Sequence, residues 1–234
     1  MTVRLSKKLW IMALVMQQVV AQPIMKQVEA VEQKITQMPS SLDNYQQLQG
    51  LVAGHYLEFS ATQRQQIRSF LEKHGHFAQL TTYLPTEAGK RIVIKGMVQD
   101  EKGQAIPHAH LFVFQTDSRG YYAPDDSIRK RMNEADPRLF AYLSTDAKGH
   151  YELHTIRPAH YPIRYQGRYI PQHIHFNVQA NGYQPLQIQM TFSDDPAMQD
   201  AYWQDWAQKL HFPVVSLRSE GNQWVGVNNL VLKK

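Results

Sequence analysis

The spacing of apolar residues changes its period near Pro85, and this change constrains the fold more than any other feature of the chain. Before Pro85, apolar residues recur at steps of four and three, as on one face of a helix: Ile24, Val28, Val31, Ile35 and Met38. After it, apolar and polar residues alternate in short runs between glycine-bearing turns such as 100–103 and 146–149. Period two is typical of strands. The sequence therefore predicts a helical region followed by a β domain.

Helices are expected at two places along the chain. The N-terminal region should hold about three, over residues 24–38, over 45–59, and between Ser60 and Gly75. Ser60 with Gln63 matches a capping box, and Gly75 is placed to end that helix. A later helix should open with Asp195 as N-cap and Pro196 at its first position, and run to about residue 210.

Strands are expected over six segments, which are residues 91–98, 110–115, 149–154, 173–180, 184–192 and 224–232. Several short strands joined by turns favour an antiparallel sandwich. The predicted fold class is mainly β, with an antiparallel β-sandwich core over residues 89–234 and a helical N-terminal region over residues 22–88. The helical region can cover one end of a sheet or pair with a second copy, so a homodimer is a candidate assembly.

The first 21 residues are typical of a signal peptide. Arg4, Lys7 and Lys8 form a basic start, an apolar run follows, and small residues precede Gln22. The apolar run is shorter than the roughly 20 residues that span a bilayer. An uncleaved amphipathic helix is the alternative. Cleavage predicts a periplasmic or secreted protein with no membrane attachment, and lowers the formal charge from +5 to +2. No basic run occurs elsewhere, so we expect no nucleic-acid partner.

His173 and His175 form the sharpest local pattern in the chain. Side chains two apart in a strand point to the same face, so the two imidazoles project together while Ile174 and Phe176 enter the core. Such a pair can bind a metal, although surface or hydrogen-bonded histidines share the pattern. A cupin would need a glutamate shortly after, and none occurs before Glu220. The superoxide dismutase sandwich uses a disulfide, and the chain has no cysteine.

Tyrosines supply the oxygen donors that remain near this pair. Tyr122 lies at the end of the segment Gln115 to Tyr122, two residues after Gly120, and Tyr161 lies in the segment Thr155 to Pro162. Phenolate is a hard, strongly donating oxygen ligand, and two phenolates with two imidazoles suit ferric iron. Binding to the cation would deprotonate phenols whose free pKa is about 10.

Several motifs, in one order, resemble the catalytic core of the intradiol ring-cleavage dioxygenases, most of all the β-subunit type of protocatechuate 3,4-dioxygenase. They cover residues 91–195 and comprise Gly96 to Asp100, Gly103, Pro107, Ala109 to Gln115, Gly120-x-Tyr122, Thr145-Asp146-x-x-Gly149-x-Tyr151, Thr155-Ile-x-Pro158, Tyr161-Pro162, Pro171-x-His173-Ile-His175-Phe176 and Leu186-x-x-Gln189-x-x-Phe192. The resemblance implies a ferric ion with Tyr122 and His173 as equatorial ligands and Tyr161 and His175 as axial ligands. It also implies that a catechol displaces Tyr161, and that Gln189 supports the site.

One position departs from the family pattern. The family usually carries an arginine three residues before the first histidine, and Ile170 stands there in this chain. Arg168 and Arg164 are close enough in sequence to replace it, or are solvated loop charges. We take Tyr161, Arg168 and Gln189 as the candidate catalytic residues. His160 lies near the predicted site as well.

The resemblance implies an exported Fe(III) enzyme that uses O2 to cleave a catecholic ring between its two hydroxylated carbons. The sequence does not identify the catechol. Two other readings stay open, and Ile170 motivates the first. The chain could bind iron or a catecholic ligand on the same fold without turnover, or the four side chains could share a purely structural sandwich by coincidence.

Overall fold

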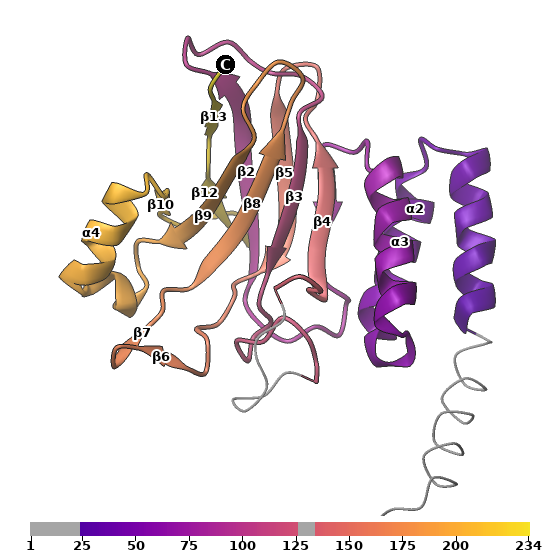
Figure 1. Cartoon of the computed structure of the whole chain (residues 1–234), viewed down its shortest axis with the longest axis horizontal. Helices are drawn as coiled ribbons and strands as arrows, with labels where there is room; N and C mark the ends of the chain where they lie inside the picture. Colours follow the sequence, from indigo (N-terminus) through magenta and orange to yellow (C-terminus); the bar gives the residue numbers. More distant parts are fainter. Residues whose placement is uncertain (1–23, 126–133) are drawn as a thin grey trace, which may run out of the picture.

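The computed structural model describes residues 24–125 and 134–234, and Figure 1 shows how their helices and strands are arranged. The predicted signal peptide, residues 1–21, lies outside the described residues. Within the described part of the chain, every helix is too short or too polar to cross a membrane.

The N-terminal region is helical, with a helix over residues 24–37 followed by α2 (Leu42–Gly54), the 3-10 turn η1 (Tyr56–Glu58) and α3 (Ala61–His74). The predicted apolar face of the first helix is buried, except Met38, which lies beyond the helix end and is exposed. The capping box between Ser60 and Gln63 is confirmed, and Gly75 is the C-cap of α3. The helices lie beside β4 (Leu139–Ser144) in Figure 1. Gln49 of α2 donates to the carbonyl of Phe140 there.

Two sheets make up the rest of the fold. The first has the order β1 (Gln79–Thr81), β5 (His150–Ile156), β2 (Arg91–Asp100), β12 (Gln223–Val227) and β11 (Arg218–Glu220), with β13 (Leu230–Leu232) also paired to β2. The second has the order β10 (Val214–Val215), β9 (Leu186–Phe192), β8 (His173–Gln179), β3 (His110–Gln115) and β4. A separate hairpin joins β6 (Arg164–Tyr165) to β7 (Arg168–Tyr169).

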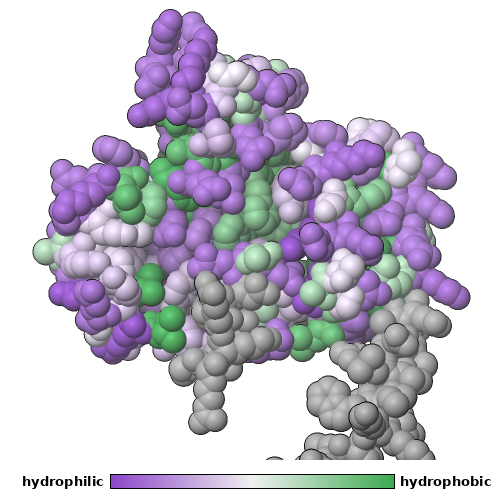
Figure 2. All heavy atoms as spheres, viewed as in Figure 1, coloured by the Kyte–Doolittle hydropathy of each residue, from purple (hydrophilic) through white to green (hydrophobic). Residues whose placement is uncertain are grey.

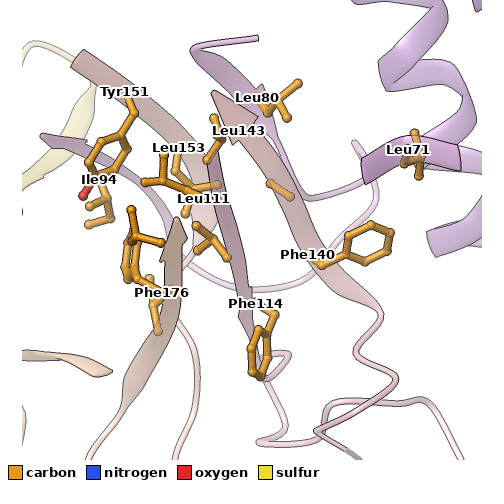
Figure 3. Close-up of a cluster of buried hydrophobic side chains, with 14 of the residues drawn as sticks. Leu71, Leu80, Ile94, Leu111, Phe114, Phe140, Leu143, Tyr151, Leu153 and Phe176 are labelled. Carbon is orange, nitrogen blue, oxygen red and sulfur yellow. The ribbon is translucent and has the colours of Figure 1, made fainter. Parts of the chain in front are cut away.

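The two sheets share one apolar core. Figure 3 shows Ile94 and Leu153 of the first sheet in the same cluster as Leu111 and Phe176 of the second. The ring of Tyr151 lies 5.9 Å from that of Phe176, which joins β5 to β8 across the core. Burial of these alternate side chains is the main driving force for pairing the sheets.

The sheets are mixed rather than purely antiparallel. The central pairs are antiparallel, as predicted: β2 with β5, β3 with β4, β3 with β8, and β8 with β9. Parallel pairs are added by β1 with β5, β10 with β9, and β12 and β13 with β2. β1 also lies inside the region 22–88 that the sequence assigned to helices. The last predicted strand is split into β12 and β13.

The helix predicted from Asp195 is present in two pieces. Asp195 caps the 3-10 helix η2 (Pro196–Gln199), and Asp200 then caps α4 (Ala201–Lys209). The 3-10 helix η2 ends at Asp200 because the side chain of Asp200 accepts from the backbone N–H of Tyr202. This bond caps the start of α4. Trp203 of α4 is buried in a small cluster apart from the main core.

The outer face of the second sheet, turned away from the core, carries a row of aromatic side chains. Register pairs Phe112 with Tyr142 and Phe114 with His175. Their rings stack, with centroids 4.8 Å apart for Phe112 and Tyr142 and 4.3 Å for Phe114 and His175. In Figure 2 most of the visible surface is hydrophilic, and hydrophobic residues gather toward the middle of the view. The candidate site lies at one end of the outer face of the second sheet.

Candidate metal centre

Strand β8 presents His173 and His175 on the outer face of the second sheet. Ile174 and Phe176 between and beyond them are fully buried on the core side, as the alternation predicts. Both histidines are nonetheless buried, with 7% and 8% of their surface exposed. Something other than the sheet must therefore cover them, and two loops do so.

The first covering loop follows β3 and is shaped by the side chain of Asp117. Its Oδ1 accepts from the backbone N–H groups of Arg119 and Tyr121, at 2.8 and 3.1 Å. This turn directs Tyr122 inward, where it is 1% exposed. The backbone N–H of Arg138 donates to the carbonyl of Tyr122 and fixes the far side of the loop. Tyr121 is only half-buried, so Tyr122 is the more deeply buried of the two adjacent tyrosines.

The second covering loop follows β5 and carries Tyr161. The hydroxyl of Thr116 donates to the carbonyl of Ala159 at 3.0 Å, which ties this loop to the first one. The loops approach most closely at Gly120, where a Cβ atom would overlap the carbonyl oxygen of His160. Gly120 also has φ +86°, a conformation that side chains with a Cβ rarely adopt. The glycine is therefore required by both space and backbone angle.

The four predicted ligands meet in one cluster. Tyr122 Oη lies 2.8 Å from Nε2 of His175, and Tyr161 Oη lies 3.0 Å from Nε2 of His173. A hydrogen bond between the hydroxyls of Tyr122 and Tyr161 joins the two pairs. The phenols come from loops after two different strands, and the imidazoles come from a third strand.

Burial decides the protonation states in the cluster. It lowers the pKa of His175 to about 3 and also lowers the pKa of His173, so both imidazoles are neutral at physiological pH. Nδ1 of His173 lies 2.7 Å from the carbonyl oxygen of Pro171, which can only accept. The ring hydrogen of His173 is therefore on Nδ1, and Nε2 offers its lone pair to the cluster. Burial raises the pKa of Tyr122 and of Tyr161 above the ordinary phenol value.

This donor set fits ferric iron. Metal–oxygen and metal–nitrogen bonds of transition-metal sites are roughly 2 Å long, so donors on neighbouring corners lie roughly 3 Å apart. The separations of 2.8 Å between Tyr122 and His175 and 3.0 Å between Tyr161 and His173 match that spacing. No group of three or more His, Cys, Asp or Glu side chains that could hold a metal occurs within 24–125 and 134–234. The tyrosines are thus needed to complete the set, and phenolate oxygen favours a hard, highly charged cation.

Phe114 and Gln189 surround the cluster on the sheet. The ring of Phe114 stacks on His175 with an interplanar angle of 3°. Gln189 is the direct cross-strand neighbour of His175 on β9 and lies on the same face of the sheet. This position agrees with the supporting role expected for Gln189, although its catalytic part stays a prediction.

Arg168 is engaged away from the cluster. Its Nε donates to Oδ2 of Asp200 at 2.9 Å, and its side chain is 39% exposed. Arg168 thereby ties the β6–β7 hairpin to the N-terminus of α4. The guanidinium of Arg164 lies over the ring of Tyr169 in the same hairpin. The structure therefore brings neither arginine to the position expected of a replacement. The side chain of Ile170 itself packs against apolar residues of both clusters.

Two acidic residues near the site were missed in the sequence. Oε1 of Glu134 lies 3.3 Å from Oη of Tyr161, and its charge contributes to the raised pKa of both phenols. The sequence indicates only a helix cap at Asp195, whereas its carboxylate also contacts the residues that precede two candidate ligands. Glu134 carries no sequence signal, because it is one charged residue in a stretch of charged ones. The cap motif at Asp195 concealed its second role.

A mainly β chain that gathers two phenols and two imidazoles at the end of one sheet defines a candidate non-haem iron protein. A family model described as "Dioxygenase" matches residues 70–230, which is more than half of the chain. The chain therefore belongs to the intradiol ring-cleavage dioxygenase family, as its motifs indicated.

Curated relatives come from several branches of this family. A chlorocatechol 1,2-dioxygenase of Rhodococcus opacus is 29% identical over 168 residues, which are 63% of this chain and 61% of that protein. A protocatechuate 3,4-dioxygenase beta chain of Burkholderia cepacia is 32% identical over 114 residues, or 47% of this chain and 48% of that protein. Catechol 1,2-dioxygenase 2 of Acinetobacter lwoffii is 28% identical and has 46% of its length matched. The chain thus spans about half to three fifths of these relatives, and the β-subunit type is one of several.

Solved structures agree on the fold. A catechol 1,2-dioxygenase of Acinetobacter sp. ADP1 superposes with a TM-score of 0.56 at 22% identity, covering 68% of this chain and 58% of that one. A 3-chlorocatechol 1,2-dioxygenase of Rhodococcus opacus 1CP gives a TM-score of 0.53 at 19% identity, covering 93% and 99%.

Proposed function

We propose that the protein is a ferric-iron dioxygenase that uses O2 to cleave a catecholic ring between its two hydroxylated carbons. The observation that carries the proposal is the cluster of Tyr122, Tyr161, His173 and His175, whose donor atoms have the spacing of a metal coordination sphere. The names of the relatives, which act on catechol, chlorocatechol or protocatechuate, support a catecholic substrate.

The four side chains would hold the iron, with two neutral imidazoles and two phenolates as ligands. Bound ferric iron would supply Lewis acidity, drawing electron density from a coordinated catecholate so that its ring becomes reactive toward O2. The hydrogen bond from Nδ1 of His173 to Pro171 fixes the orientation of that ring. Stacking on Phe114 does the same for His175.

Tyr161 is the ligand best placed to take up a proton from the substrate. It is 9% exposed, compared with 1% for Tyr122. Its hydroxyl also reaches Oε1 of Glu134, which gives a proton on Tyr161 Oη a neighbouring acceptor. Burial raises the pKa of Tyr161, so its hydroxyl would hold a proton whenever it is not a metal ligand. Tyr161 could therefore accept a proton from a catechol hydroxyl.

The N-terminal sequence supports a periplasmic or secreted location for this activity. Residues 1–21 carry a basic start, an apolar run and a small-residue site before Gln22. N-terminal sequencing of the protein recovered from the periplasm or the medium tests this part. A mature chain that begins at Gln22 supports export, and an intact Met1 in the cytoplasm contradicts it.

A second candidate function is an iron- or catechol-binding protein without turnover. Ile170 favours it, because an apolar side chain occupies the position where the family usually carries an arginine. Electrostatic stabilisation by such a charge is worth about 3 kcal/mol in comparable sites. The arginines of the nearby hairpin are engaged elsewhere in the structure.

Oxygen uptake separates the two candidates. Iron-loaded protein should show the visible phenolate-to-iron charge-transfer band and should consume O2 when given catechol, chlorocatechol or protocatechuate. The band with no uptake across these compounds would favour the binding protein. Protein that stays colourless after iron loading would contradict both candidates and leave a structural sandwich.

A further inference from the structure

The carboxylate of Asp195 connects the two segments that carry Tyr161 and His173. Asp195 is fully buried. Its Oδ1 accepts from Nε2 of His160 at 2.7 Å, and its Oδ2 accepts from the backbone N–H of Gln172 at 2.6 Å. His160 immediately precedes Tyr161, and Gln172 immediately precedes His173. One carboxylate therefore links the two residues that immediately precede two neighbouring candidate ligands.

A helix cap alone does not account for these contacts. Capping η2 uses one bond, from the backbone N–H of Ala197 to Oδ1 at 3.0 Å. The two other donors lie in separate loops, 35 and 23 residues earlier in the chain. Burial opposes the charge on Asp195, yet hydrogen bonds from His160, Ala197 and Gln172 outweigh it and hold the pKa of this carboxyl below its ordinary value. Three donors to a buried carboxylate form a rigid junction.

We propose that Asp195 is a positioning residue, which sets the separation of Tyr161 and His173 by holding the residue before each of them. This inference rests on the proposed function of the cluster. Oη of Tyr161 and Nε2 of His173 lie 3.0 Å apart. Tyr161 lies in a loop and His173 is the first residue of β8, so regular strand pairing does not fix this distance. The junction holds the side chain of His160 and the backbone of Gln172, and it makes no contact with the side chain of Tyr161 itself.

Asp194, the residue next to Asp195, also carries a carboxylate but does not contact the residues that precede Tyr161 and His173 in the same way. Asp194 pairs with the guanidinium of Arg157 at 2.7 and 2.8 Å, and its side chain is 57% exposed. The Nε of Arg157 donates in turn to the side chain of Gln172. Arg157 begins the loop that carries Tyr161, so this more exposed pair also joins that loop to the strand end. Asp195 differs because it is fully buried and contacts the residues that immediately precede Tyr161 and His173.

Two substitutions separate the junction from the helix cap. Asp195→Asn keeps the size but must turn an amide group toward one of the N–H donors, which opens the junction. Asp195→Ser keeps a side chain that caps helices well but is too short to serve both His160 and Gln172. Asp100→Asn is the matched control. Asp100 is also buried and accepts two backbone N–H groups, at the opposite end of β2 from the site.

Two substitutions of His160 test the junction without touching the cap. His160→Gln retains a side-chain N–H that can donate to Oδ1 of Asp195, and His160→Ala does not. We expect the glutamine variant to keep the properties of the unsubstituted protein and the alanine variant to lose them. This pair keeps the proposal testable if Asp195→Asn or Asp195→Ser fails to fold.

The readouts are the visible charge-transfer spectrum per bound iron and the steady-state constants. Supporting partners of metal ligands typically change metal affinity or activity by about 10- to 100-fold when removed. We therefore expect Asp195→Asn, Asp195→Ser and His160→Ala to shift or weaken the band. They should also lower kcat at least tenfold while KM changes less.

Two outcomes decide the proposal. A shifted band in these variants, together with an unchanged band in Asp100→Asn and His160→Gln, supports it. Folded Asp195 and His160 variants that keep the spectrum and kcat of the unsubstituted protein overturn it. Failure of the proposed function is seen separately, because the unsubstituted protein would then lack turnover or lack the band. A band without turnover still leaves the spectral comparison valid.

Discussion

Oη of Tyr122 lies 2.8 Å from Nε2 of His175, although 53 residues separate them in the chain. Strand pairing produces this contact, because β3 ends next to β8 and register sets Phe114 opposite His175. The turn after β3 then directs Tyr122 back over the imidazole. The candidate site is thus a consequence of β3 ending where β8 begins.

Replacing Tyr161 by phenylalanine should remove one phenolate ligand without unfolding the protein. The ring remains to fill the space, and only its hydroxyl is lost. We expect iron-loaded Tyr161→Phe to lose much of its visible absorbance and most of its activity. Absorption spectra and oxygen uptake at equal iron content measure both.

Tyr121→Phe is the matched control, because Tyr121 is a neighbouring tyrosine that is half-buried and outside the cluster. It should keep the colour and the rate. Unchanged turnover in Tyr161→Phe, or equal losses in both variants, would count against Tyr161 as a ligand.

Gly120→Ala should destabilise the protein more than Gly182→Ala. Both glycines have left-handed backbone angles, φ +86° and +84°, so both variants bear a conformational cost of about 1–2 kcal/mol. Only at Gly120 would the new methyl group overlap a carbonyl oxygen, while nothing lies within 4 Å at Gly182. Overpacking of this kind costs roughly a further 1–3 kcal/mol. Urea unfolding of the two variants measures the difference, and equal losses would show that the loops can separate freely.

The iron-free protein should lose stability as the pH falls from 6.5 toward 4.5. Burial lowers the pKa of His173 and His175 in the folded state, while the unfolded chain keeps the ordinary value near 6.5. Below 6.5 the unfolded state therefore binds protons that the folded state does not, and unfolding becomes more favourable. Each such histidine contributes up to about 1.4 kcal/mol per pH unit.

His175→Gln should flatten this dependence. The variant should lose about 1–2 kcal/mol less than the unsubstituted protein between pH 7 and pH 5, since one buried imidazole is gone. His110→Gln, on the exposed end of β3, is the control and should retain the full dependence. Denaturant unfolding at the two pH values gives the free energies. Parallel pH curves for all three proteins would contradict the assigned burial of His175.

Much of the site could be predicted because its ligands follow a strand period and a set of spaced motifs. The alternation of side chains in β8 was enough to predict that His173 and His175 share one face, because local sequence specifies that alternation. Tyr122 and Tyr161 needed the family resemblance, since no local pattern brings two loops together. The structure confirms that the four side chains meet.

Other features depended on tertiary contacts that sequence patterns do not carry. β4 was not predicted as a strand, because Leu139 to Ser144 is almost wholly buried and its apolar run does not alternate. Arg168 was assigned by sequence distance from the histidines, but the β6–β7 hairpin directs it to Asp200. Asp195 was read from its local cap motif, while its other two bonds come from distant loops.

Oxygen-isotope labelling of the product tests the central claim most directly. Iron-loaded protein is given a catechol under labelled dioxygen, and the product is identified by mass spectrometry. The predicted result is a ring-opened diacid, cleaved between the two hydroxylated carbons, that contains both atoms of one O2 molecule. A coloured, iron-loaded protein that leaves catechol, chlorocatechol and protocatechuate intact would contradict the claim that the bound iron serves ring cleavage.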